Sequence, residues 1–188
     1  SMSTTAASGG YWIAANADRI FALPTTLTGS IGVAGGKFVL SGLWDHVGMN
    51  WGTLKYGANA GYFSPNETFN EYQTRRYNAL MDGIYNDFVS LVAEGRNMSF
   101  SEADNIARGR VWTGSQALEI GLVDELGGLD SALDYAASLI GKESRHHVII
   151  NVMPKPKTIV DDFLELLGTQ AAMGRHMEFY GKMADVMG

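Results

Sequence analysis

The sequence predicts an α/β domain, because short strand-like segments alternate with helical patterns along most of its length. Residues 67–94 carry apolar side chains at helical spacing and predict one long amphipathic helix. Residues 19–23 and 26–33 are predicted as short strands, and the proline at position 24 separates them. With 188 residues and 46% hydrophobic content, the chain is long enough to bury one core.

The remaining elements are predicted from the same periodicities and from Gly and Pro signals. A first helix is expected from Ser8 to about Asn16, because an apolar helical pattern follows a turn of small residues. Ser101 to Asp104 resembles a capping box that opens a short helix. Further helices are expected at 38–47, 115–120 and 129–140, strands at 50–56 and 147–152, and loops at 35–36 and 57–65.

Two prolines and two lysines between Met153 and Lys157 predict an extended connector. We therefore expect a main domain over 1–152 and, over 153–188, this connector followed by a short amphipathic helical tail. The tail is rich in methionine, which suits packing against another surface. The chain starts only a few residues before its first helix, so we expect it to be a fragment of a longer protein.

Composition excludes several classes of function. The 20 acidic and 14 basic residues give a net charge of −6, and no Lys/Arg cluster is present, so no nucleic-acid partner is expected. The chain lacks cysteine, which excludes thiol catalysis, disulfides and cysteine-ligated metals. No apolar run reaches the ~18 residues that a membrane-spanning helix needs. Neither a metal nor a cofactor is expected.

The segment Ser8-Gly9-Gly10-Tyr11 is the most informative part of the chain. A serine at the start of a helix lies close to backbone N–H groups that have no acceptor within the helix. Such groups can bind the oxyanion that forms when a serine attacks an acyl carbon. The alternative is that Ser8 only caps the helix and that the two glycines permit close packing.

Three further blocks follow Ser8-Gly9-Gly10-Tyr11 in order. They are Pro24-Thr25-Thr26-Leu27-Thr28-Gly29-Ser30-Ile31-Gly32, Gly109-Arg110-Val111-Trp112-Thr113-Gly114 and Gly121-Leu122-Val123-Asp124. Together the blocks closely resemble the signal peptide peptidase A family, also called protease IV, over roughly residues 1–141. The resemblance implies a fold like that of Clp protease and crotonase, with the helical tail as a short C-terminal extension.

The resemblance also implies roles for three residues. Ser8 matches the nucleophile of these serine–lysine peptidases, and the backbone N–H of Gly9 would stabilise the oxyanion. Ser30 matches the serine that hydrogen-bonds the amine of the lysine base. The alternative for Ser30 is a turn hydroxyl that satisfies local backbone groups. Tyr11, Trp12, Phe21 and Ile31 could line an apolar groove near Ser8 or belong to the core.

The lysine base is absent from its expected place. In single-length members it lies in a loop that here contains Ala60, and alanine cannot accept a proton. Lys37 and Lys55 are expected to be solvated, and none of the four histidines lies in a motif with an orienting carboxylate. Double-length members of the family carry the lysine in a first copy of the fold and the serine in a second. The sequence is therefore expected to be the C-terminal half of a double-length member.

The resemblance implies partners and a location. The substrates would be cleaved signal peptides, and the N-terminal half of the same protein would supply the base and a membrane anchor. A homo-oligomer with active sites at its interfaces, at the periplasmic face of the inner membrane, is expected. The alternatives are a non-catalytic assembly module with a vestigial Ser8, a crotonase-like acyl-thioester enzyme, and a phage-type head protease. No basic cluster for a nucleotide supports the acyl-thioester reading.

Overall fold

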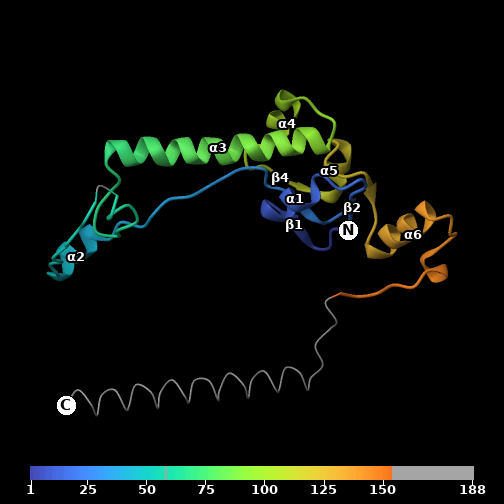
Figure 1. Ribbon diagram of the computed structural model, residues 1–188, viewed down its shortest axis with the longest axis horizontal. Coiled ribbons are helices and arrows are strands. Elements are labelled where there is room, and N and C mark those ends of the chain that lie inside the picture. Colours follow the sequence, from blue (N-terminus) through green and yellow to red (C-terminus); the bar gives the residue numbers. More distant parts are fainter. Residues whose placement is uncertain (58, 154–188) are drawn as a thin grey trace, which may run out of the picture. The chain divides into compact units, whose positions relative to one another are not determined.

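A computed structural model describes residues 1–57 and 59–153 of the chain (Figure 1). The order of its elements is β1 (Thr5–Ala7), α1 (Gly9–Ala14), β2 (Phe21–Ala22), β3 (Leu27–Gly29), α2 (Ser41–Val47), α3 (Glu71–Gly95), α4 (Phe100–Ile106), β4 (Val111–Thr113), α5 (Gly114–Glu119), β5 (Glu125–Leu126), α6 (Leu129–Leu139) and a 3₁₀ turn at Arg145–His147. The predicted mixture of helices and strands is confirmed.

Two small sheets hold the described strands. In the first, β1 pairs in parallel with β3, and β3 pairs antiparallel with β4. In the second, β2 pairs in parallel with β5. Because β1 runs directly into α1, this pairing fixes the start of α1 beside the C-terminal end of β3.

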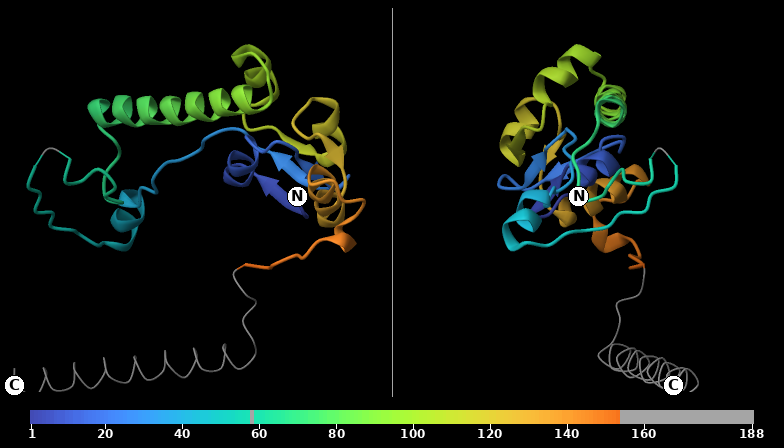
Figure 2. Two further views of the ribbon diagram at one scale, coloured as in Figure 1. Left: turned by 45° about the vertical axis from the view of Figure 1, so that its right-hand side comes forward. Right: turned by 90° about the vertical axis from the view of Figure 1, so that its left-hand side faces the viewer.

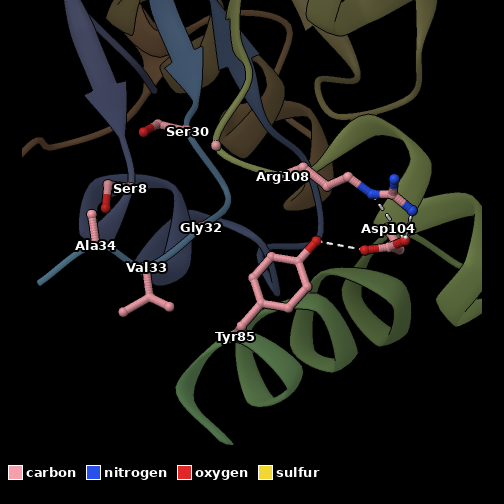
Figure 3. Close-up of a pocket in the computed structure, with 9 residues that line it drawn as sticks. Ser8, Ser30, Gly32, Val33, Ala34, Tyr85, Asp104 and Arg108 are labelled. Atoms are coloured by element: carbon pink, nitrogen blue, oxygen red, sulfur yellow. Dashed lines mark hydrogen bonds and ion pairs between the residues drawn. The ribbon is translucent and has the colours of Figure 1, made fainter. Parts of the chain in front are cut away.

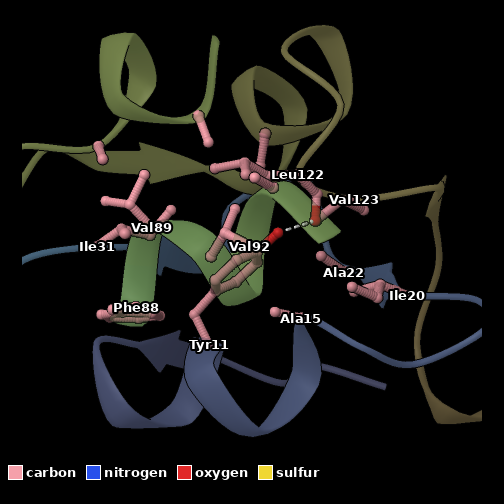
Figure 4. Packing of buried hydrophobic residues seen from close by; sticks show 14 of the residues in the cluster. Tyr11, Ala15, Ile20, Ala22, Ile31, Phe88, Val89, Val92, Leu122 and Val123 are labelled. Carbon is pink, nitrogen blue, oxygen red and sulfur yellow. Dashed lines mark hydrogen bonds between the residues drawn. The ribbon is translucent and has the colours of Figure 1, made fainter. Parts of the chain in front are cut away.

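The core lies between α1, the C-terminal end of α3 and the segment from α4 to β5 (Figure 4). Tyr11 and Ala15 come from the α1 side, and Phe88, Val89 and Val92 come from α3. The core is completed by Ile20, Ala22, Ile31, Ala103, Ala107, Ala117, Leu122 and Val123. Burial of these apolar side chains supplies the main favourable free energy of folding.

Helix α3 packs over only part of its length. It begins at an Asn70–Gln73 capping box, as each side chain bonds the other residue's backbone N–H. The predicted apolar stripe is buried at Phe88 and Val92, whereas Tyr72 and Leu80 are more than half exposed. Helix α4 lies beside the C-terminal end of α3 (Figure 2). The residues that α3 contributes to the core therefore come from its C-terminal part.

Several predicted elements are wrong or displaced. Residues 50–56 form no strand, because they lie exposed without a neighbouring strand to pair with. Residues 147–152 likewise form no strand. The capping box of α4 is Ser99 with Glu102, two residues before the expected start. The two-residue β5 and three-residue β4 were not predicted, because so short a strand carries no periodicity.

The chain divides into two compact units, residues 1–145 and 146–188. The second is described only as far as residue 153. The expected helical tail lies outside the described residues, and the expected domain division at 152 stays a prediction.

Candidate active site

Ser8 lies between β1 and α1 in an unusual backbone conformation. Its φ of 53° and ψ of −119° place it outside the regions that non-glycine residues ordinarily occupy. Its N–H donates to the carbonyl of Gly29 at 2.8 Å, so the end of β3 holds it in place. The Ser8 hydroxyl makes no capping hydrogen bond to α1. The interpretation of Ser8 as a side-chain cap is therefore wrong.

Gly9 is the first residue of α1. The N–H groups of the first helical turn have no acceptor within the helix, so the Gly9 N–H points away from the helix body. Gly9 is exposed, and a Cβ built at this position would meet no other atom within 4 Å. The backbone at Gly9 is thus accessible next to the Ser8 hydroxyl.

Ser30 follows β3 directly and also has a positive φ, of 49°. Its N–H donates to the carbonyl of Arg110 at 2.7 Å, and the N–H of Gly109 donates to the carbonyl of Ile31 at 2.9 Å. The Ser30 hydroxyl makes no hydrogen bond with the described residues. The Ser30 hydroxyl therefore does not satisfy a local backbone group, as the alternative interpretation required.

Ser8 and Ser30 line one cavity of about 740 Å³ (Figure 3). Its wall is formed by segments far apart in the sequence, because the hydrogen bonds just described join the end of β3 to the turn after α4. A Cβ on Gly32 would lie 2.9 Å from the Gly109 nitrogen, so this join leaves no room for a side chain. The other lining residues are Gly32, Val33, Ala34, Tyr85, Asp104, Arg108 and Gly109.

Tyr85, Asp104 and Arg108 were missed by the sequence reasoning. The Tyr85 hydroxyl donates to Asp104 Oδ1 at 2.5 Å, and Arg108 Nη2 donates to Asp104 Oδ2 at 2.6 Å. The hydrogen bonds from Arg108 and Tyr85 lower the pKa of Asp104, while burial and the bond to this carboxylate raise the pKa of Tyr85. Only the i, i+4 spacing of Asp104 and Arg108 hinted at this cluster.

The described lysines lie elsewhere. Lys37 Nζ donates to the carbonyl of Tyr62 at 3.0 Å and lies 4.4 Å from the centre of the Phe69 ring. Lys55 forms an ion pair with Glu67 and lowers the pKa of that carboxyl. No lysine or histidine of the described residues lines the cavity of Ser8. Ala60, where the resemblance leads us to expect the lysine of single-length members, is exposed.

The aromatic residues near Ser8 are part of the core. Tyr11, Phe21 and Ile31 are buried, and Trp12 packs against the ring of Phe88. The Tyr11 hydroxyl donates to the carbonyl of Leu122 at 2.8 Å, and burial raises the pKa of Tyr11. None of these side chains lines the cavity, and Tyr11 and Trp12 pack α1 onto the core.

The part of the chain that the structure describes contains neither a metal-ligand cluster nor a membrane-spanning helix. In it, no three side chains of His, Asp or Glu come together as metal ligands. No described helix has the length and apolar character required to cross a membrane.

A serine whose hydroxyl is uncapped beside a cavity is compatible with a serine nucleophile. Residues 1–142 match peptidase family S49, and the chain belongs to this family. It is 42% identical over 130 residues to a candidate signal peptide peptidase SppA of Enterococcus faecium, covering 69% of this chain and 38% of that protein. It is 34% identical over 170 residues to the chloroplastic serine protease SPPA of Arabidopsis thaliana, covering 90% of this chain and 25% of that protein.

A third relative is Protease 4 of Haemophilus influenzae, which is 36% identical over 150 residues, covering 76% of this chain and 23% of that protein. The chain thus spans between about a quarter and two fifths of the length of these three relatives.

Proposed function

We propose that the chain is the serine-bearing half of a signal peptide peptidase with a Ser–Lys dyad, and that Ser8 is its nucleophile. The observation that carries the proposal is the conformation of Ser8. Ser8 has a positive φ between β1 and α1, and its hydroxyl makes no cap and lies at the cavity. Backbone strain of this kind persists only where the surrounding structure enforces it, and it is concentrated at functional sites.

The proposed reaction is acyl transfer from a peptide bond. A neutral lysine amine takes the proton of the Ser8 hydroxyl as the oxygen attacks the scissile carbonyl carbon. The Gly9 N–H donates to the oxyanion, and removal of one such donor typically raises the barrier by about 3 kcal/mol. Collapse of the intermediate expels the amine, which receives the proton from the lysine. Water then hydrolyses the acyl-enzyme by the same route.

Ser30 is proposed to orient the base. Its hydroxyl lines the same cavity and lacks a partner among the described residues, so it is available to an incoming amine. By accepting a hydrogen bond from the neutral amine, Ser30 would align the lone pair of the amine with Ser8, as the third member orients the base in other nucleophile–base pairs.

The base itself is proposed to come from another copy of the fold. Ala60 occupies the position of the family's lysine, Lys55 is paired with Glu67, and Lys37 is bonded to a backbone carbonyl. This pattern supports the double-length arrangement, in which an N-terminal half carries the lysine. We infer the Clp protease and crotonase-like fold for both halves, a homo-oligomer with the sites at its interfaces, and signal peptides as substrates at the periplasmic face of the inner membrane.

The test is peptide cleavage by the complete protein. Ser8→Ala is expected to lower kcat/KM by roughly 10³-fold or more, because removal of a nucleophile leaves only binding and oxyanion stabilisation. Ser101→Ala, at an exposed serine of α4, serves as the matched control. Unchanged cleavage by Ser8→Ala would refute the proposal and favour a non-catalytic assembly module.

A further inference from the structure

Most of the described non-glycine residues with positive φ lie at one place. Among the described residues, four non-glycine residues have positive φ, namely Ser8, Ser30, Asn97 and Arg108. Asn97 follows the C-terminal end of α3, where asparagine commonly adopts this conformation. The other three line the same cavity. Two of them have proposed catalytic roles, and the third, Arg108, has none.

Hydrogen bonds to the end of β3 hold the turn that carries Arg108. The N–H of Gly109 donates to the carbonyl of Ile31 at 2.9 Å, and the N–H of Ser30 donates to the carbonyl of Arg110 at 2.7 Å. Arg108 is therefore fixed relative to the strand that positions Ser30. Figure 3 shows Ser8 and Ser30 on one side of the cavity and Tyr85, Asp104 and Arg108 on the other.

Asp104 orients the guanidinium of Arg108 through two of its three nitrogen atoms. Its Nε and Nη2 donate to one oxygen of Asp104 at 3.2 and 2.6 Å, and the other oxygen accepts from Tyr85. Among the described residues, no hydrogen bond from Nη1 to an acceptor is found, although Tyr85 also acts on this guanidinium. A guanidinium held in this way retains N–H donors in the planar geometry that suits a carboxylate.

A second cation lies near the Asp104–Arg108 pair. Asp104 and Arg108 are the charged residues among the described ones that line the cavity, so their charges offset each other there. Arg110 lies outside the lining, and its charge acts on Asp104. The Arg110 guanidinium donates to the backbone carbonyls of Asn105 and Ala107 and forms no ion pair with a described carboxylate.

We propose that Arg108, held by Asp104 and Tyr85, forms a subsite for a carboxylate group of the bound peptide, on the side of the cavity away from Ser8. The inference rests on the proposed function, because it assigns a preference to the same peptide-binding cavity. The carboxylate can belong to an acidic side chain or to the free C-terminus of a short peptide, and the chemistry of recognition is the same for both.

The test measures binding separately from cleavage. Fluorescent peptides bind to the complete protein carrying Ser8→Ala, and anisotropy gives their Kd. In one series of peptide pairs, the two members carry Glu or Gln at the same position, and this position moves along the peptide from pair to pair. In a further pair, one peptide has a free C-terminus and the other an amidated C-terminus. The peptide with the carboxylate is expected to bind about two- to fivefold more tightly, since Arg108 is exposed and solvent screens its charge.

Arg108→Asn removes the charge while keeping a residue that tolerates positive φ. It is expected to bring the ratio of the two Kd values to about one or to invert it, because Asp104 then stays unpaired. Arg108→Lys should restore part of the preference. Arg75→Gln is the matched control, because Arg75 forms the same i, i+4 ion pair with Glu71 but lies outside the cavity.

A ratio of one for every pair in the parent protein, or an unchanged ratio in Arg108→Asn, would overturn the subsite. Absence of peptide binding would overturn it as well. A different result would refute the proposed function. If Ser8 in the otherwise unmodified protein does not react with a fluorophosphonate while the carboxylate preference persists, the cavity binds peptides without Ser8 acting as nucleophile.

Discussion

Asp124→Asn should destabilise the chain through a largely buried ion pair. Asp124 accepts from Arg96 Nη2 at 2.6 Å and Nη1 at 3.1 Å, and from the N–H of Ile20 at 2.7 Å. The Arg96 side chain is only 8% exposed and that of Asp124 24% exposed. Arg96 Nε also donates to the carbonyl of Gly121, so the pair joins α3 to the segment before β5.

The expected magnitude follows from this burial. Removing one partner of a buried ion pair typically costs about 3 to 5 kcal/mol, because the remaining charge stays in the protein without compensation. We take the lower end, about 3 kcal/mol, since Asp124 is partly exposed and asparagine can still accept one hydrogen bond. For a chain of this size the loss corresponds to a fall in Tm of about 6 to 12 °C.

The assay is urea unfolding of the whole chain, followed by tryptophan fluorescence. Glu71→Gln removes a carboxylate from an exposed ion pair with Arg75 and should change the free energy of unfolding by less than about 1 kcal/mol. Adding Arg96→Met to Asp124→Asn should cost less than the two single changes together. A loss below about 1 kcal/mol for Asp124→Asn would refute the reasoning.

Three other perturbations have defined outcomes. Burial opposes ionisation of Asp124, but its hydrogen bonds with Arg96 and Ile20 lower its pKa in the folded state. The stability that the Asp124 carboxylate contributes is therefore present above about pH 4 and is lost as the pH falls through the folded pKa. In urea unfolding from about pH 6 to pH 3, Asp124→Asn should therefore show a shallower dependence on pH than the wild type. Tyr11→Phe leaves the buried carbonyl of Leu122 without its donor and should cost about 1 to 3 kcal/mol in the same assay. Gly32→Ala places a Cβ 2.9 Å from the Gly109 nitrogen, and a loss of about 1 to 3 kcal/mol by thermal unfolding is expected.

The sequence predicted the fold best where a local signal and the tertiary structure agree. The start of α1 after Ser8, the end of α2 at Gly48 and the span of α6 follow from small residues, a left-handed glycine and helical spacing. The strand expected at 50–56 failed because a strand requires a neighbour, which a single stretch of sequence does not reveal. Short strands such as β5 exist only through their pairing with β2.

The candidate site likewise contains residues that the sequence predicted and residues that it did not. Ser8 and Ser30 were predicted from their motifs and line one cavity, although the positive φ of both residues was not foreseen. The Tyr85–Asp104–Arg108 cluster was missed, because these residues come from α3, from α4 and from the turn that follows, and only packing brings them to one cavity. Tyr11 was a candidate for a groove, but its hydrogen bond to Leu122 places it in the core.

The most direct test of the account is the intact mass of this chain after treatment with a serine-reactive fluorophosphonate, alone and with the proposed lysine-bearing half added. The account predicts no adduct for the chain alone and one adduct when the other half is present, absent in Ser8→Ala. An adduct on Ser8 in the isolated chain would contradict the division of the dyad, because a base within the chain would then activate the serine. No adduct under either condition would contradict Ser8 as the nucleophile.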